Sequence, residues 1–276
     1  MSELVGLDHV SLSLEGPTLS MGVQSGSLVG IFGPAAAGKS ALLRVITGRE
    51  KPVEGKVEVR CDHHLAEGFT LGRRVHPLSL ARRGRGPHSA SVATEALLAA
   101  RLWEVKNEAL SQLSPSQVAA CELLEVFTSD APLLALDGQL DRLDPWTLSS
   151  VLAYVRRLKS RGAALVVATN RADLAHIFDA LIVLDDNELR FAGSPEDLMR
   201  NAKSHELVVT AKDQPGVLAL VAPFSVSVSE QADGIHLVAD EGQEVAARLL
   251  AEGYGNVKFV IHRPPSLEDA LLSLLR

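Results

Sequence analysis

Eight consecutive residues near the N-terminus have the types and the spacing that bind phosphate. Residues 33–40 read Gly-Pro-Ala-Ala-Ala-Gly-Lys-Ser, and they match the P-loop (Walker A) pattern at every defined position. Glycines let the backbone curl so that successive N–H groups face an anion, and the lysine reaches the outer phosphates of a nucleotide. We therefore predict a nucleotide site formed by Gly33, Pro34, Ala35, Ala36, Ala37, Gly38, Lys39, Ser40 and Ala41.

The segments around this loop fit the same chemistry. Residues 28–32 form a short apolar run typical of a buried strand, and a helical pattern follows the loop. A second apolar run, residues 132–136, leads directly into Asp137. In P-loop proteins a hydroxyl of the loop and a carboxylate at the end of a strand hold Mg²⁺. We therefore predict Ser40 and Asp137 as the magnesium ligands of a Mg²⁺-ATP site.

The elements that must position these residues follow from patterning. Strand-like and helical segments alternate up to about residue 203, which predicts an α/β fold with a largely parallel sheet, a P-loop NTPase domain. We expect a strand at 10–14, a helix at about 92–113 and another at 116–127. The pattern then changes, so the chain divides into residues 1–203 and a small α+β domain, residues 204–276.

Composition narrows the function. The 276 residues carry a net charge of −7 and only 4% aromatic residues, which disfavours general nucleic-acid binding. Two cysteines make no disulfide framework, and the sequence shows neither a signal peptide nor an apolar run of the ~20 residues that a membrane span needs. These features predict a cytoplasmic protein.

Further motifs point to a family. Residues 113–117 read Leu-Ser-Pro-Ser-Gln, which resembles the LSGGQ signature of ABC-type ATPases, and residues 143–145, Leu-Asp-Pro, match the family's D-loop. Residues 3–203 thus resemble an ABC nucleotide-binding domain. The remainder is similar to the C-terminal appendage of ABC-2-type exporter ATPases. The resemblance implies that two subunits enclose ATP between them, so that Ser114, Ser116 and Gln117 would contact ATP held by the partner subunit, and that the pair drives a membrane permease.

The departures from the family pattern concentrate at the positions that hydrolyse ATP. Gly138 stands where the family has its catalytic glutamate, Asn170 at the switch histidine, and His76 at the Q-loop glutamine. Pro115 replaces a signature glycine and has no backbone N–H. No aromatic residue that could stack on adenine precedes Phe32. We therefore predict a degenerate ATPase that binds Mg²⁺-ATP and hydrolyses it weakly or not at all.

The leading interpretation is the ATP-binding subunit of an ABC transporter, held on the inner face of the cell membrane by a permease. Its second partner would be another ABC ATP-binding subunit, as a homodimer or a heterodimer. The alternative is an ATP sensor or scaffold that does not hydrolyse ATP and regulates a partner protein. A P-loop kinase would have no use for the signature and D-loop.

Three other features remain open. Cys61-Asp62-His63-His64 contains metal-ligand types, but four adjacent residues do not easily surround one ion, so a polar loop is favoured. The Arg82-Arg83-Gly84-Arg85 segment is either a contact for an acidic permease helix, an anionic lipid or a nucleic acid, or a solvated loop. The C-terminal domain serves dimerisation, regulation or stability.

Overall fold

The computed structural model describes residues 2–66, 74–83, 89–200, 205–224, 226–231, 234–253, 256–263 and 265–275. Two compact units make up the chain, Met1–Pro195 and Glu196–Leu274. The predicted domain boundary between residues 203 and 204 itself lies outside the described residues. Among the described residues, no helix has the length and apolar character needed to cross a bilayer.

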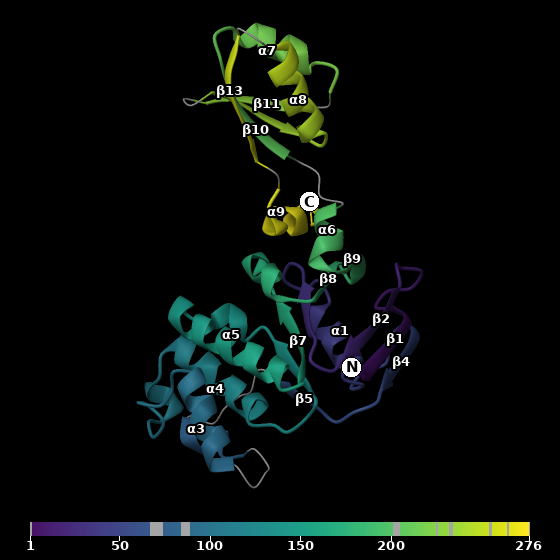
Figure 1. Ribbon diagram of the computed structural model, residues 1–276. Coiled ribbons are helices and arrows are strands. Elements are labelled where there is room, and N and C mark those ends of the chain that lie inside the picture. Colours follow the sequence, from purple (N-terminus) through teal and green to yellow (C-terminus); the bar gives the residue numbers. More distant parts are fainter. Residues whose placement is uncertain are drawn as a thin grey trace. The chain divides into compact units, whose positions relative to one another are not determined.

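A six-stranded sheet forms the centre of the first unit (Figure 1). Its order is β5-β6-β7-β3-β8-β9, and every neighbouring pair is parallel except β8 and β9. The strands are β5 (His63–Ala66), β6 (Leu133–Asp137), β7 (Ala164–Thr169), β3 (Leu28–Phe32), β8 (Ala180–Asp185) and β9 (Glu188–Gly193). β3 and β7 are buried along their whole length, as continuous apolar runs predict. The predicted α/β fold with a parallel sheet is confirmed.

An antiparallel sheet of order β2-β1-β4 accompanies it, with β1 (Glu3–Ser11), β2 (Leu19–Gln24) and β4 (Glu54–Val59). Helix α1 (Lys39–Ile46) shares one hydrophobic core with both sheets, in which Val5, Leu43 and Val166 are each fully buried. The strand expected at residues 10–14 is wrong beyond Ser11, because the chain turns after β1 and Glu15 takes a positive φ of 58°.

Short helices connect β5 to β6: α2 (Pro77–Ala81), α3 (Ser89–Ala99), the 3-10 turn η1 (Leu110–Gln112) and α4 (Pro115–Phe127). The helix expected over 92–113 is wrong beyond Ala99, because Arg101 takes a positive φ of 57° that breaks a right-handed helix. The helix expected over 116–127 is present as α4. The remaining elements of this unit are η2 (Leu140–Arg142), α5 (Pro145–Ser160) and η3 (Ala172–Ile177).

The second unit contains a four-stranded antiparallel sheet with helices on one face (Figure 1). The chain order is α6 (Pro195–Arg200), β10 (His205–Ala211), α7 (Gln214–Val221), β11 (Val226–Gln231), β12 (Gly234–Ala239), α8 (Gly242–Glu252), β13 (Val257–Arg263) and α9 (Leu267–Ser273). The sheet order is β11-β12-β10-β13. Leu207, Leu237, Val217 and Leu249 join the sheet, α7 and α8 in a separate core.

Candidate nucleotide site

The sheet topology collects the predicted site residues at one edge. The P-loop follows β3, Asp137 ends β6, and Asn170 follows β7, which lies between those two strands. Because parallel strands present their carboxyl ends at the same edge, these three segments meet there, at the usual position of a ligand in an open α/β sheet.

The P-loop curls around its own lysine. The Lys39 ammonium donates to the carbonyl oxygens of Gly33 (2.9 Å) and Pro34 (2.5 Å). Gly38 is the N-cap of α1 and has a φ of 93°, which favours glycine, and a Cβ there would displace the Asn187 side chain, whose amide oxygen would lie 2.6 Å away. Burial lowers the pKa of Lys39 below its usual value, while the carboxylates of Asp141 and Asp137 oppose that shift. The loop therefore holds a cation at the N-terminus of a helix, where an anion binds well.

The two predicted magnesium ligands are in contact. The Ser40 hydroxyl, in the first turn of α1, donates to the Asp137 carboxylate at the end of β6 across 2.9 Å. A hydroxyl and a carboxylate oxygen are hard ligands of the kind that Mg²⁺ prefers, and Mg²⁺ completes its shell with phosphate oxygens and water. The two side chains therefore fit a Mg²⁺-nucleotide.

Gly138 leaves open space where the family has a carboxylate. Its φ is 78°, and apart from Gly138 itself and its two neighbours in the chain, no atom of the described residues lies within 4 Å of the position that a Cβ would take. Its N–H donates to the carbonyl of Ala168 on β7 (3.0 Å), which fixes this turn. Any residue with a side chain is disfavoured in this left-handed conformation by about 1–2 kcal/mol.

The next residue, Gln139, is fully buried and was missed by sequence reasoning. Its amide nitrogen donates to the carbonyl of Ala66 at the end of β5 (2.9 Å). Its amide oxygen accepts the backbone N–H of Asp137 (2.7 Å). Gln139 thus anchors the Asp137 end of β6 to the neighbouring strand. The sequence signal was only a polar residue in a loop, which does not distinguish a buried amide from an exposed one.

Asp141 lies close to the same site. Its carboxylate accepts the backbone N–H of Asn170 (3.0 Å) and the hydroxyl of Thr169, so it joins η2 to the end of β7. Asn170 is exposed. Of the two carboxylates that raise the pKa of Lys39, Asp141 has the larger effect. It is therefore the carboxylate that couples the P-loop lysine to the Asn170 segment.

The signature-like segment forms a helix cap within its own chain. Ser114 caps α4: its hydroxyl accepts the Gln117 N–H (3.3 Å), while the Gln117 side chain accepts the Ser114 N–H (2.9 Å). Pro115 occupies the first helical position, which suits a residue without an N–H. Ser116 donates to the Asp144 carboxylate (2.6 Å) and accepts the Asp144 N–H (2.9 Å).

Asp144 in turn caps α5 by accepting the backbone N–H groups of Trp146 and Thr147, each at 3.0 Å. The Ser116 hydroxyl, followed by the Thr147 backbone, holds the pKa of Asp144 well below its usual range. The side chains of all three predicted signature residues are therefore engaged inside their own chain. Their contact with a partner's ATP stays a prediction.

His76 lies at the N-terminus of α2, exposed, and its backbone carbonyl accepts the Ser79 hydroxyl (2.7 Å). The segment 67–73, between β5 and this helix, lies outside the described residues. The Q-loop role of His76 stays a prediction.

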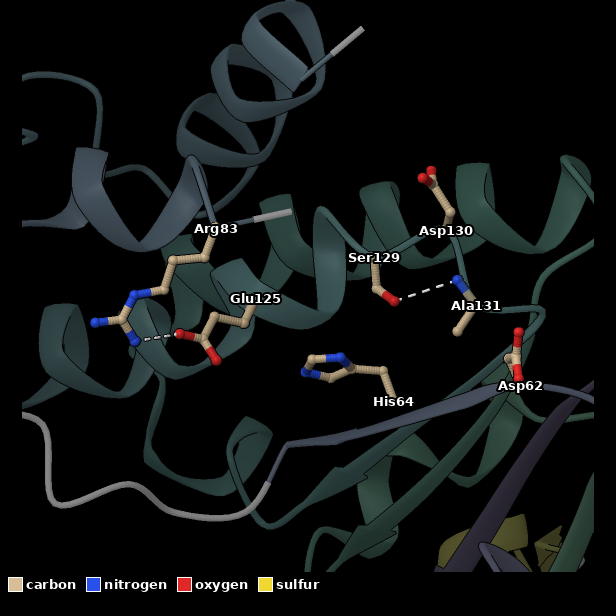
Figure 2. Close-up of a pocket in the computed structure, with 7 residues that line it drawn as sticks. All are labelled: Asp62, His64, Arg83, Glu125, Ser129, Asp130 and Ala131. Atoms are coloured by element: carbon tan, nitrogen blue, oxygen red, sulfur yellow. Dashed lines mark hydrogen bonds and ion pairs between the residues drawn. The ribbon is translucent and has the colours of Figure 1, made fainter. Parts of the chain in front are cut away.

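A cavity of about 520 Å³ lies at the amino ends of β5 and β6, the end of the sheet opposite to Asp137 (Figure 2). Asp62, His64 and Asp130 line it, together with the Arg83–Glu125 ion pair of 2.7 Å. Arg83 is therefore neutralised within the chain, while Arg85 lies outside the described residues. In the described part of the chain, no three His, Cys, Asp or Glu side chains are grouped to hold a metal ion, and this includes the Cys61–His64 segment.

The fold and the loop geometry define a P-loop nucleotide-binding domain. Residues 17–140 match the ABC transporter family model. Among relatives, Nod factor export ATP-binding protein I of Rhizobium etli is 26% identical over 280 residues, covering 93% of this chain and 87% of that protein. Cobalamin import ATP-binding protein BtuD of Halobacterium salinarum is 28% identical, covering 84% of this chain and 66% of its own.

Solved structures agree on the fold. The ATP-binding cassette MJ0796, a dimer in a post-hydrolysis state with ADP and Pi, superposes with a TM-score of 0.59 at 22% identity, covering 69% of this chain and 98% of its own. A nucleotide-free ATP-binding cassette from an ABC transporter superposes with a TM-score of 0.57 at 18% identity, covering 70% of this chain and 92% of its own. Residues 17–140 are thus similar to the ABC transporter family, and the whole first unit has the fold of ABC ATP-binding cassettes.

Proposed function

We propose that this chain is the Mg²⁺-ATP-binding subunit of an ABC transporter and that it hydrolyses ATP weakly or not at all. The main support for this proposal is a contrast at one edge of the sheet. Lys39, Ser40 and Asp137 lie together in an arrangement that suits Mg²⁺-ATP, whereas Gly138 leaves the adjacent position without a side chain. The subunit acts on the inner face of the membrane, with a permease and a second ABC ATP-binding subunit.

ATP binding uses groups that are already in place. The two P-loop carbonyls now bonded to Lys39 lie in the same loop as the N–H groups that receive phosphate, so the ammonium needs only a local movement to reach the outer phosphates. Ser40 and Asp137 would hold Mg²⁺, which neutralises phosphate charge when bound. Because the Lys39 ammonium has to move only within its own loop, this arrangement supports ATP binding.

The groups that position an attacking water are absent from their family positions. Gly138 offers no carboxylate, and the Asn170 side chain is a neutral amide that cannot supply a positive charge. Asp141 is the nearby carboxylate, but the Thr169 hydroxyl and the Asn170 N–H occupy its oxygens. Loss of a general base alone typically slows a reaction by ~10²–10⁴-fold.

The Nod factor export relative matches 93% of this chain and the cobalamin import relative 84%, and the proposed direction, export, follows the greater coverage. The signature residues remain candidates to contact ATP on the partner, although their side chains must first leave the Ser114–Gln117 and Ser116–Asp144 bonds. We therefore expect ATP-dependent closure with the second subunit to be weaker than in a family member with a glycine-rich signature.

Equilibrium binding of a fluorescent ATP analogue, with and without Mg²⁺, tests the nucleotide site. The purified wild-type chain is expected to bind it, and Lys39→Ala to bind it at least ~10-fold more weakly, because one charge-assisted contact is lost. Lys51→Ala, which removes an exposed lysine outside the P-loop, is the matched control and should bind the analogue like the wild-type chain. Unchanged binding by Lys39→Ala would refute the site. Co-purification with a permease distinguishes the transporter subunit from the alternative, an ATP sensor or scaffold, which would bind ATP and be recovered with a soluble partner only.

A further inference from the structure

The P-loop lies between two neighbours of different chemistry. The strand that leads into the loop, β3, has β7 and then β6 on one side, and β8 and then β9 on the other. Asp137 ends β6, whereas Asn187 lies in the turn between β8 and β9. The proposed magnesium ligand Asp137 and the β8–β9 turn therefore lie on opposite sides of the loop.

The turn between β1 and β2, residues 12–18, lies on the β8–β9 side of the loop. A Cβ on Gly38 would lie 3.2 Å from the Leu12 side chain and 2.6 Å from the Asn187 amide oxygen, so both residues border the loop at the same glycine. Leu12 and Asn187 also line one small cavity. Leu14 follows Leu12 by two residues, at most about 7 Å along the chain, within the same turn.

These two sides correspond to the two ends of a nucleotide. In a P-loop protein the lysine reaches the β- and γ-phosphates, and Mg²⁺ bridges the same two phosphates. Ser40 and Asp137, which are in contact, would hold that Mg²⁺, so the outer phosphates face the β6 side. The ribose and the base leave the triphosphate at its other end and are expected to extend toward residues 12–18 and Asn187.

The side that receives the base presents an aliphatic side chain. The turn of residues 12–18 reads Leu-Ser-Leu-Glu-Gly-Pro-Thr and contains no aromatic residue, and Leu14 is 79% exposed. The Phe32 ring at the end of β3 is only 1% exposed, so it cannot stack on a base. The His9 imidazole on β1 contacts the Thr18 hydroxyl at 3.4 Å. Leu14 is therefore the exposed apolar side chain of this turn.

Contact with leucine does not distinguish one base from another. Every base has an apolar face, and contact with that face is tolerant of sequence. Selection of one base requires hydrogen-bonding groups matched to its edge. The exposed Asn187 amide beside Gly38 contains both a donor and an acceptor, so it suits the edge of any base. The phosphate and magnesium contacts are the same for ATP, GTP, CTP and UTP.

We infer that this site selects the triphosphate and its Mg²⁺ rather than the base, so that its ligands are nucleoside triphosphates as a group. The base rests on Leu14 and contributes little to affinity, because stacking on an aromatic ring, which typically gains roughly 5- to 100-fold, is replaced by aliphatic contact. The inference rests on the proposed function, since it concerns the same site, and it names a wider class of ligand for that site.

Competition against an ATP analogue labelled on the ribose tests the inference on the full-length chain with Mg²⁺. For the wild-type chain, ATP, GTP, CTP and UTP are expected to have inhibition constants within ~10-fold of one another. Leu14→Tyr is expected to raise the affinity for ATP and GTP at least ~5-fold, because it supplies a ring for stacking, and to change that for inorganic triphosphate less than ~2-fold. Leu98→Tyr, which alters a side chain 54% exposed on α3, is the matched control and should change none of these affinities.

The wild-type measurement decides the inference without any variant. A preference of more than ~10-fold for ATP over another of the four nucleotides would overturn it. It is also overturned if Leu14→Tyr, with the circular dichroism of the wild-type chain, raises ATP and GTP affinity less than ~5-fold or raises that for inorganic triphosphate equally, because the base would then not rest on this turn. If neither the analogue nor inorganic triphosphate binds, the proposed function fails, an outcome distinct from selective binding of ATP.

Discussion

At the scale of single residues, the side chains proposed to bind phosphate and magnesium lie next to an open position. Lys39 bonds to the P-loop carbonyl of Gly33 and Ser40 to Asp137, as the proposed roles require. Gly138 has a positive φ and its N–H donates to Ala168. Restoring a glutamate is therefore sterically possible, because the space is empty, but strained, because the backbone is left-handed.

Gly138→Glu is predicted to raise ATP turnover while lowering stability by about 1–2 kcal/mol. Gly138→Ala is the matched control, because it carries the same backbone strain without the carboxylate. Steady-state phosphate release and thermal unfolding measure the two effects. We expect equal loss of stability in both variants and a gain of turnover in the glutamate variant alone. A gain in both, or in neither, would contradict the role assigned to the missing carboxylate.

ATP affinity is predicted to fall at alkaline pH. Burial lowers the pKa of Lys39, so its ammonium loses its proton at a lower pH than an ordinary lysine, about 10.4. The protonated form binds phosphate, and affinity therefore decreases as pH rises through that pKa.

The Asp141 carboxylate opposes this shift in Lys39. Asp141→Asn should therefore move the alkaline loss of affinity to still lower pH, while Asp173→Asn, which removes an acid on η3 paired with Arg171, should not. Titration of analogue binding between about pH 7 and 10 measures the midpoint. An unchanged midpoint in Asp141→Asn would show that this carboxylate does not act on Lys39, and an upward shift would contradict the direction assigned to it.

At the scale of elements, helix ends connect the parts of the site. Ser116 on α4 bonds to Asp144, the N-cap of α5, so the signature-like segment and the D-loop are linked directly. Asp144→Ala is predicted to destabilise the fold by about 1–2 kcal/mol, because it removes an N-cap and the Ser116 partner together. Ser116→Ala should cost less.

Chemical denaturation of Ser116→Ala, Asp144→Ala and the double variant measures the coupling between these two side chains. The double variant should lose less stability than the sum of the single changes, since both remove the same bond. Strict additivity would show that the Ser116–Asp144 bond contributes nothing.

At the scale of the whole molecule, local signals were predictable and distant contacts were not. The P-loop spacing and the buried strands β3, β6 and β7 are readable because each depends on adjacent residues. The contacts of Gln139 with Ala66 and of Asp141 with Asn170 join residues 73 and 29 positions apart. They arise only when β5, β6 and β7 lie side by side. The end of α3 at Ala99 was not predicted, because the left-handed turn at Arg101 has no sequence signature of its own.

The C-terminal unit illustrates the same distinction. Alternation along each strand predicted a small α+β domain, but the order β11-β12-β10-β13 decides which apolar residues gather on one face. Phe259 and Val238 are 21 positions apart in sequence and lie on strands that both pair with β10. Which side chains share a face of this sheet is therefore a property of the fold rather than of any one segment.

The central claim is that the chain binds Mg²⁺-ATP without efficient hydrolysis. The most direct test measures binding stoichiometry and turnover on one wild-type preparation at saturating Mg²⁺-ATP, with Lys39→Ala reporting any contaminating ATPase. We predict one ATP bound per chain and turnover below about 0.1 s⁻¹, under the ~1–10³ s⁻¹ typical of enzymes. Stoichiometric binding with Lys39-dependent turnover within that typical range would contradict the account.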